Sequence, residues 1–201
     1  MELELRQETV RGWESVCRAT LEQEETAEMI VPDACPDIWQ VLDGEARLLL
    51  QRKEPQDGKG EFSGLLKTTI LYQPEGEKGL RAMEVTLHFS ASPELTQLTR
   101  RSMLHVIPRV LSVDVHLLNP RKVLVRVGYC LDIEGFEPQA RSLTSLVEEP
   151  ERYGIRQKTG ELRSFQTVYA QEKAFTYQDT VVLPAGRPDA VELLRTRAQC
   201  T

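Results

Sequence analysis

Two neighbouring stretches of the sequence, 107–117 and 123–133, alternate between apolar and polar residues, and Asn119-Pro120 lies between them. The apolar positions are Ile107, Leu111, Val113, Val115 and Leu117, then Val123, Val125, Val127, Tyr129, Leu131 and Ile133. A period of two predicts strands with one apolar face each, and Asn-Pro predicts a turn, so the pair should form an antiparallel hairpin. Its apolar faces, with Val113 and Val125 among them, need a covering layer.

Three more stretches predict strands by their β-branched, aromatic or alternating residues: 46–52, 62–72 and 83–89. Turn-forming residues fill 53–59 and 73–79 between them. The stretch 93–103 has two interpretations, a helix with Leu95 and Leu98 on one face or a bent crossing between sheets. The predicted fold class is therefore mainly β, an antiparallel, sandwich-like module with one or two short helices.

One short helix is expected in the stretch 29–42, Met-Ile-Val-Pro-Asp-Ala-Cys-Pro-Asp-Ile-Trp-Gln-Val-Leu. The stretch predicts a strand end, a Pro-Asp turn and then one or two helical turns. Pro36 suits the first helical position, where no N–H is needed, and the Asp37 carboxylate suits the positive end of the helix dipole. Three apolar residues would then share one helical face and anchor it in the core: Ile38, Val41 and Leu42.

This segment is repeated near the end of the chain. The stretch 181–194 has the same Pro-x-x-x-Pro-Asp spacing, with apolar residues at the matching places. The register continues upstream without a gap, since Trp13-Glu-Ser-Val16 aligns with Phe165-Gln-Thr-Val168. The predicted organisation is a complete β module over 8–135, a linker over 136–160 with room for a short edge strand at 143–147, and the beginning of a second, truncated copy over 161–201.

A truncated copy lacks the hairpins that would cover its apolar residues, which are Val182, Leu183, Val191 and Leu194. Chains of this size rarely leave such a patch open. The segment 161–201 should therefore either add a strand to its own first module or pair with the same segment of another copy. We expect self-association, because the segment offers both an apolar face and an open strand edge.

Four stretches of the chain, in this order, resemble the SPOCS domain of SipL-like spore coat morphogenetic proteins: 25–38, 60–72, 83–90 and 118–127. The resemblance covers roughly residues 8 to 135. It implies a scaffold or adaptor in sporulation, made in the mother-cell cytoplasm, placed at the forespore surface and linked to the ATPase of the coat's base layer. SipL-like proteins end in a LysM-like peptidoglycan-binding segment, which the 201 residues do not contain, so the resemblance implies no partner for that part.

Charge and hydropathy exclude two classes of partner. The net charge is −6, so there is no basic excess to neutralise the phosphates of a nucleic acid. No apolar run approaches the roughly 20 residues that cross a bilayer, and residues 1–6 lack the apolar region of a signal peptide. The sequence predicts a cytoplasmic protein without a membrane span.

The motifs of catalysis and metal binding are absent from the sequence. It has no GxSxG, no phosphate-binding glycine loop and no HExxH. Many carboxylates could suggest a glycosidase, but acidic residues on turns and solvent faces explain them more simply. The four cysteines have no metal-ligand spacing, and the three histidines are scattered over predicted strands: Cys17, Cys35, Cys130 and Cys200, and His88, His105 and His116. We therefore predict no enzyme, no metal site and no cofactor.

The candidate interaction surface consists of Asp33, Asp37 and Trp39. The simpler interpretation makes Asp33 a turn cap and Asp37 the start of the helix, and it expects a tryptophan to be buried. Trp39 nevertheless lies off the apolar helical face, which makes it the best candidate for a contact. The alternative function, a carbohydrate-binding or cell-wall-associated β-sandwich, requires a row of exposed aromatics, whereas aromatics are 6% of the chain and mostly occupy apolar strand positions.

Overall fold

The computed structural model describes residues 5–158, 160, 161, 163, 165, 167, 173, 176–188, 190 and 192–196. Within this part the chain forms six strands and one short 3-10 helix. The strands are β1 (Leu5–Ile30), β2 (Ile38–Gln56), β3 (Lys59–Pro74), β4 (Arg81–Ala91), β5 (Met103–Asn119) and β6 (Lys122–Val147), and the helix η1 is Pro150–Tyr153. The described residues contain no helix that is long and apolar enough to cross a membrane.

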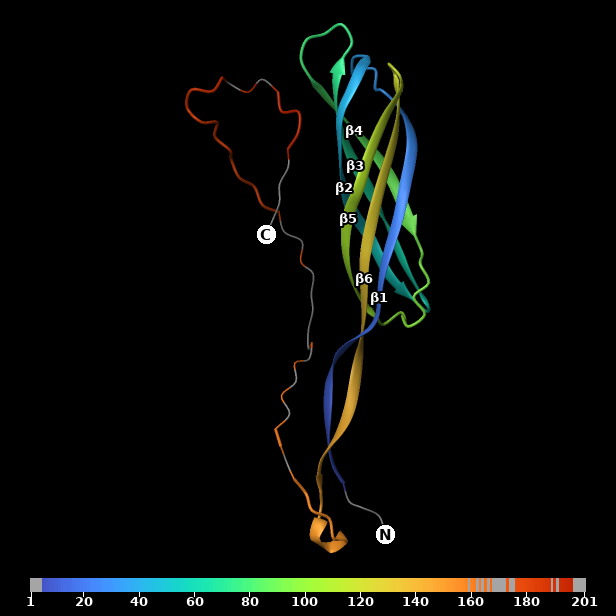
Figure 1. The fold of residues 1–201 in the computed structure, drawn as a ribbon, viewed down its shortest axis with the longest axis vertical. Coiled ribbons are helices and arrows are strands. Elements are labelled where there is room, and N and C mark those ends of the chain that lie inside the picture. The colour runs from blue at the N-terminus through green and yellow to red at the C-terminus, as the bar shows by residue number, and fades with distance from the viewer. Residues whose placement is uncertain are drawn as a thin grey trace.

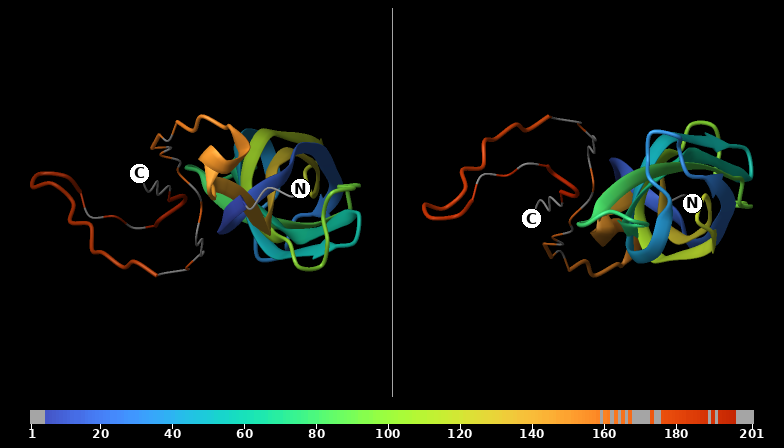
Figure 2. Two further views of the ribbon diagram at one scale, coloured as in Figure 1. Left: turned by 90° about the horizontal axis from the view of Figure 1, so that it is seen from below. Right: turned by 90° about the horizontal axis from the view of Figure 1, so that it is seen from above.

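The strands form two antiparallel sheets of three strands each, in the orders β1-β6-β5 and β2-β3-β4. Figure 1 shows them as long, twisted layers, and the end-on views of Figure 2 show them curving around one core. The sheets come close where β2 meets β5, since a Cβ on Gly44 would lie 2.9 Å from Cγ2 of Val115. The mainly β, antiparallel, sandwich-like fold class is confirmed.

The predicted hairpin is the centre of the structure. β5 and β6 pair antiparallel, with Val113 opposite Val127 and Val115 opposite Val125. Val113 is half-buried against alternate residues of β6. These β6 residues are buried between the sheets: Val123, Val125, Val127, Tyr129, Leu131 and Ile133. The facing sheet contributes alternate residues of β3 and β4 in the same way. The period of two seen in the sequence is therefore the inward-facing set of each strand.

The helix predicted at 36–42 is wrong, because this segment begins β2. Ile38 pairs with Pro74 of β3, and its N–H donates to the carbonyl of Pro120 at 2.9 Å. These bonds to two different elements outweigh the favourable helix-start residues, as tertiary pairing commonly does. The only helix among the described residues is η1, which lies in the turn after β6.

The linker predicted from residue 136 is also wrong in its first half. β6 does not stop at Gly135 but continues to Val147, and its last part pairs with β1 from Leu5 to Ser15. We call residues 5–15 and 136–147 the ribbon, which extends beyond the two sheets at the lower end of Figure 1. Both faces of the ribbon meet solvent over most of its length, so the apolar alternation that identifies a half-buried strand is missing.

The stretch 93–103 is a bent crossing from one sheet to the other, the second of its two interpretations. Leu95 and Leu98 are buried, and backbone bonds tie both to Gly58 in the β2–β3 turn. Gly58 has φ +79°, a conformation that suits glycine. The last part of the crossing is held by Glu137 of β6. Oε1 of Glu137 accepts hydrogen bonds from the hydroxyls of Thr99 at 2.6 Å and Ser102 at 2.7 Å.

Candidate interaction surface

The guanidinium of Arg121 organises the end of the molecule that carries the predicted surface residues. Arg121 follows Pro120 in the tight β5–β6 turn, and its backbone N–H donates to Oδ1 of Asn119 at 2.9 Å. One guanidinium nitrogen donates to the carbonyl of Cys35 at 2.8 Å and to Asp37 Oδ1 at 3.1 Å. The other donates to the carbonyl of Val31 at 2.8 Å and to Asp33 Oδ1 at 3.1 Å. The β1–β2 loop therefore wraps around one side chain.

Backbone bonds fix the same contact from both sides. The N–H of Val31 donates to the carbonyl of Arg121 at 2.9 Å, and that of Ile38 donates to Pro120. Within the loop, the N–H of Cys35 donates to the carbonyl of Pro32 at 2.8 Å, which closes a turn. We call the loop 31–38 with Arg121 the arginine clamp. Two nitrogens of one guanidinium serve two carbonyls and two carboxylates, an arrangement that suits the forked donors of arginine and not the ammonium of lysine.

The structure brings Asp33 and Asp37 together on Arg121 and assigns them other roles than turn cap and helix start. Asp37 lies in the loop before β2, and its carbonyl accepts a hydrogen bond from Glu75 N–H at 2.8 Å. The Asp33 side chain is 108% exposed, so it presents one face to water while it pairs with Arg121. Sequence reasoning missed Arg121, although Asn119-Pro120-Arg121 stands in a stretch that resembles the same family as the loop.

Trp39 is exposed, which contradicts the expectation that the tryptophan would be buried. Its side chain is 59% exposed because the β2–β3 register skips Trp39 between the pairs Ile38–Pro74 and Gln40–Gln73. A bulge of this kind turns a side chain out of its regular alternation. A second register shift, between Val41 and Asp43, leaves Leu42 exposed as well.

Other apolar side chains are exposed at the same end of the molecule, where β1 and β5 end and β2 begins. Ile30 is 74% exposed at the end of β1, and Leu118 is 48% exposed at a register shift in β5. We call this group the tip surface, made of Ile30, Asp33, Asp37, Trp39 and Leu118. It combines exposed apolar groups with two carboxylates that are held in place by one half-buried cation.

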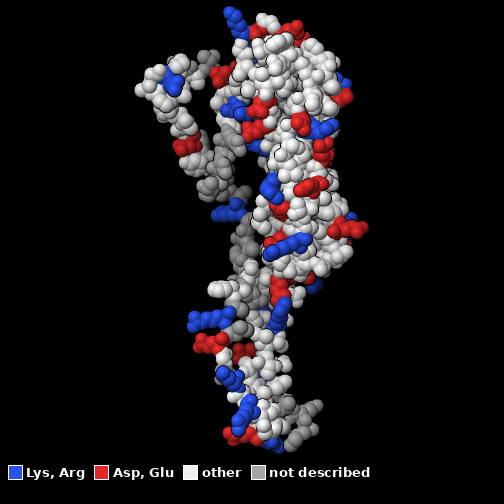
Figure 3. All heavy atoms as spheres, in the orientation of Figure 1, with Lys and Arg blue, Asp and Glu red and all other residues white. Residues whose placement is uncertain are grey.

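No histidine or cysteine belongs to the tip surface, although Cys35 lies in the arginine clamp and His116 lies two residues before Leu118 on β5. His88, His105 and His116 are all exposed on strands. Burial raises the pKa of the Cys17 and Cys130 thiols, and Cys200 lies outside the described residues. No group of three or more histidine, cysteine or acidic residues able to hold a metal ion occurs in the described part of the chain. Figure 3 shows acidic and basic side chains interspersed over the visible face.

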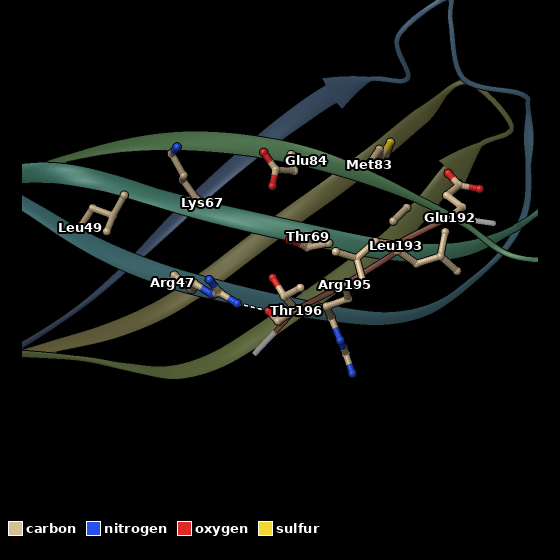
Figure 4. A pocket seen from close by; sticks show the side chains of 12 residues that line it. Arg47, Leu49, Lys67, Thr69, Met83, Glu84, Glu192, Leu193, Arg195 and Thr196 are labelled. Atoms are coloured by element: carbon tan, nitrogen blue, oxygen red, sulfur yellow. Dashed lines mark hydrogen bonds between the residues drawn. The ribbon is translucent and has the colours of Figure 1, made fainter. Parts of the chain in front are cut away.

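The last described residues lie against the outer face of the β2-β3-β4 sheet and enclose a cavity of about 520 Å³ (Figure 4). Arg195 pairs with Asp43 and, at 3.4 Å, with Glu45, while Glu192 pairs with Arg81 at 3.0 Å. Arg47 donates to the carbonyl of Thr196. The lining is charged and aliphatic, from side chains that include Arg47, Leu49, Lys67, Thr69 and Glu84.

The repeat predicted at 181–194 contains a hydrogen-bonded turn at the place that matches residues 32–35 of the first copy. The N–H of Arg187 donates to the carbonyl of Pro184 at 3.3 Å, just as Cys35 donates to Pro32. The two turns differ in backbone conformation, because Gly186 has φ +86° whereas its counterpart Ala34 has no positive φ. Val182 and Leu183 are exposed, Leu194 is half-buried, and Val191 lies outside the described residues. The described contacts of this segment are those of a fold-back onto its own module, and self-association through 161–201 stays a prediction.

In comparisons with known proteins, no family model, no curated protein and no solved structure matches the chain.

Proposed function

We propose that this chain is a non-enzymatic structural and interaction module of a spore coat morphogenetic protein, acting as a scaffold or adaptor in sporulation. The proposal rests on the resemblance to the SPOCS domain. Two of the stretches that carry it, 25–38 and 118–127, contact each other at the arginine clamp. The observation that carries an interaction role is the exposed indole of Trp39, held on a bulge beside that clamp.

The tip surface is the part that we propose to meet a protein partner. Exposed aromatic side chains on a rigid backbone are typical anchors of protein interfaces. Trp39 would be such an anchor, with Ile30 and Leu118 extending the apolar area and Asp33 and Asp37 offering charge to a basic rim. By resemblance, the partner is the ATPase of the coat's base layer, and the site of action is the forespore surface in the mother-cell cytoplasm.

The test is the affinity of the purified chain for a recombinant coat base-layer ATPase, measured by biolayer interferometry. Trp39→Ala should weaken binding about tenfold or more, as expected for an interface anchor. Leu49→Ala is the matched control, since Leu49 is exposed on the same strand but lines the cavity beside residues 192–196, away from the tip surface. Equal affinity of wild type and Trp39→Ala would remove the tip surface from the proposal, and no binding by the folded wild type would remove the partner.

The second candidate is a carbohydrate-binding or cell-wall-associated β-sandwich, and the exposed Trp39 is the observation that favours it. Sugar-binding faces use several aromatic side chains over one surface. Among the described residues, the large exposed aromatics lie on separate segments: Trp39 on β2, and Phe165 and Tyr177 in the C-terminal segment. Retention of the chain on insoluble peptidoglycan or polysaccharide, lost in Trp39→Ala, would favour this candidate over the scaffold.

A further inference from the structure

The outer edge of β1 in the ribbon carries backbone groups that β6 does not use. In the described part of the chain, the ladder of β1 is formed with β6 alone, apart from one isolated antiparallel bridge between Trp13 and Thr167. There the N–H of Trp13 donates to the carbonyl of Thr167 at 2.8 Å. Trp13 lies opposite Pro138, which has no N–H, so this position of β1 turns its polar groups away from β6.

The segment bound at this edge is a repeat of the edge itself. Phe165 is the counterpart of Trp13 in the aligned copies, and Thr167 is the counterpart of Ser15. Since the bridge is antiparallel, its continuation would bring Ser15 opposite Phe165. Trp13 then faces the counterpart of Ser15, and Ser15 would face the counterpart of Trp13. Two identical copies of β1 related by a two-fold axis through Glu14 would pair in this same register.

We propose that the outer edge of β1 around Trp13, Glu14 and Ser15 is a self-complementary interaction surface that pairs antiparallel with β1 of a second copy of this chain. Thr167 of the repeat segment already bonds to this edge within one chain, and this contact competes with that pairing. A second copy presents the same backbone and similar side chains, tryptophan for phenylalanine and serine for threonine. Strand addition at an open edge is a general route to dimers.

The charge of Glu14, which would lie on the two-fold axis, decides which partner the β1 edge prefers, a second copy of β1 or the repeat segment of its own chain. Glu14 would face Glu14 of the second copy, and like charges directly opposite each other destabilise a strand pair. The repeat has an uncharged glutamine at the aligned position of its sequence, so pairing with the repeat involves no repulsion between carboxylates. Arg141 of β6 forms an ion pair with Glu14 at 2.6 Å, which offsets part of the repulsion between two copies. The tethered repeat segment should therefore bind the β1 edge in preference to a second copy, until substitutions in the segment disrupt this contact.

The test is sedimentation velocity over a concentration series on the full chain and on a Phe165→Pro/Thr167→Pro variant. A proline at 167 keeps the carbonyl that accepts from Trp13. The two prolines nevertheless remove the N–H groups that the segment could donate to the edge and fix φ at about −65°, so strand pairing should fail and the β1 edge should be released. The variant should approach twice the chain mass at high protein concentration, whereas the wild type should need at least about tenfold more protein, because a tethered competitor acts at high effective concentration.

Further substitutions at Trp13 and Glu14 in the double variant test whether its dimer forms through the outer edge of β1. Trp13→Pro removes the donor that points away from β6 and should return the double variant to a monomer, whereas Trp13→Phe keeps the N–H and should leave it a dimer. Glu14→Gln removes the repulsion at the axis and should tighten the dimer, a result that does not depend on how well Trp13→Pro folds.

Three results in the variants would overturn the proposal. They are a double variant that stays monomeric, a dimer that survives Trp13→Pro with its thermal transition intact, and a Glu14→Gln dimer no tighter than its parent. A wild type that dimerises and loses this property in the double variant would also overturn it, because that order is expected of association through 161–201.

Discussion

Arg121 and Asp37 are 84 positions apart in the chain, and their side chains meet at 3.1 Å. The contact joins the loop after β1 to the turn between β5 and β6, so it ties the beginning of the module to its end. Asp33 and the carbonyls of Val31 and Cys35 complete the shell around the same guanidinium. The aspartates of the loop's two Pro-Asp pairs thus both form ion pairs with the guanidinium of Arg121.

Replacing Arg121 should destabilise the fold. Arg121→Ala leaves the carbonyls of Val31 and Cys35 without their donors in a partly buried loop, and we expect a loss of about 2 to 4 kcal/mol in the free energy of unfolding. Arg121→Lys should recover only a minor part, because an ammonium does not span four acceptors in a plane. Urea denaturation measures both. Asp33→Asn is the control and should stay close to wild type, since that side chain is exposed.

Val125 tests the orientation of the central hairpin. Val125 is 0% exposed and lies between Ala27 of β1 and Val115 of β5. Val125→Asp would place an unpaired carboxylate there at a cost of several kcal/mol, so the variant should not fold. Circular dichroism and thermal unfolding decide the outcome. Thr26→Asp, on the exposed face of β1 opposite Arg126, should fold normally; a cooperative transition in Val125→Asp would contradict the hairpin's orientation.

The strands that were predictable from the sequence are those with one face in the core. Val123 to Ile133 alternate because each second residue is buried, and β3 and β4 follow the same rule. Apart from the short edge strand allowed at 143–147, the ribbon was missed because both of its faces meet water. Its pairing depends on backbone bonds, which leave no hydropathy pattern.

The candidate site was predictable only in part. Asp33, Asp37 and Trp39 do lie at one end of the molecule, but their partner Arg121 could not be found by periodicity, because a single cation in a turn has no period. The exposure of Trp39 depends on a β-bulge, and a bulge is set by the register with the neighbouring strand. Helix-start signals at Pro36 and Asp37 were genuine local preferences that strand pairing overrode.

Glu137 should contribute stability that disappears in acid. Hydrogen bonds from the hydroxyls of Thr99 and Ser102 hold the pKa of Glu137 below its ordinary value of 4.5. A carboxylate with a lowered pKa in the folded state stabilises the fold above its unfolded pKa, and this contribution is lost as the pH falls through the folded pKa. Glu137→Gln should therefore melt below wild type at pH 7, and the difference should shrink well below pH 4.5.

The control for Glu137 is Glu148→Gln, which makes the same charge change in the exposed turn after β6. Its melting temperature should follow wild type at both pH values. A Glu137→Gln difference that stays constant from neutral to acidic pH would show that the carboxylate's charge does not hold the crossing in place.

The two tryptophans should report their different surroundings in fluorescence. Trp39 is 59% exposed on its bulge, whereas Trp13 is half-buried in the ribbon. Because water relaxes an exposed indole and a soluble quencher reaches it, Trp39→Phe should shift the emission to shorter wavelength and lower the acrylamide quenching constant. Trp13→Phe is the matched variant and should have the opposite effect on both quantities. If Trp39→Phe leaves the quenching constant unchanged, the indole is shielded from solvent, and Trp39 could not serve as the anchor of the tip surface.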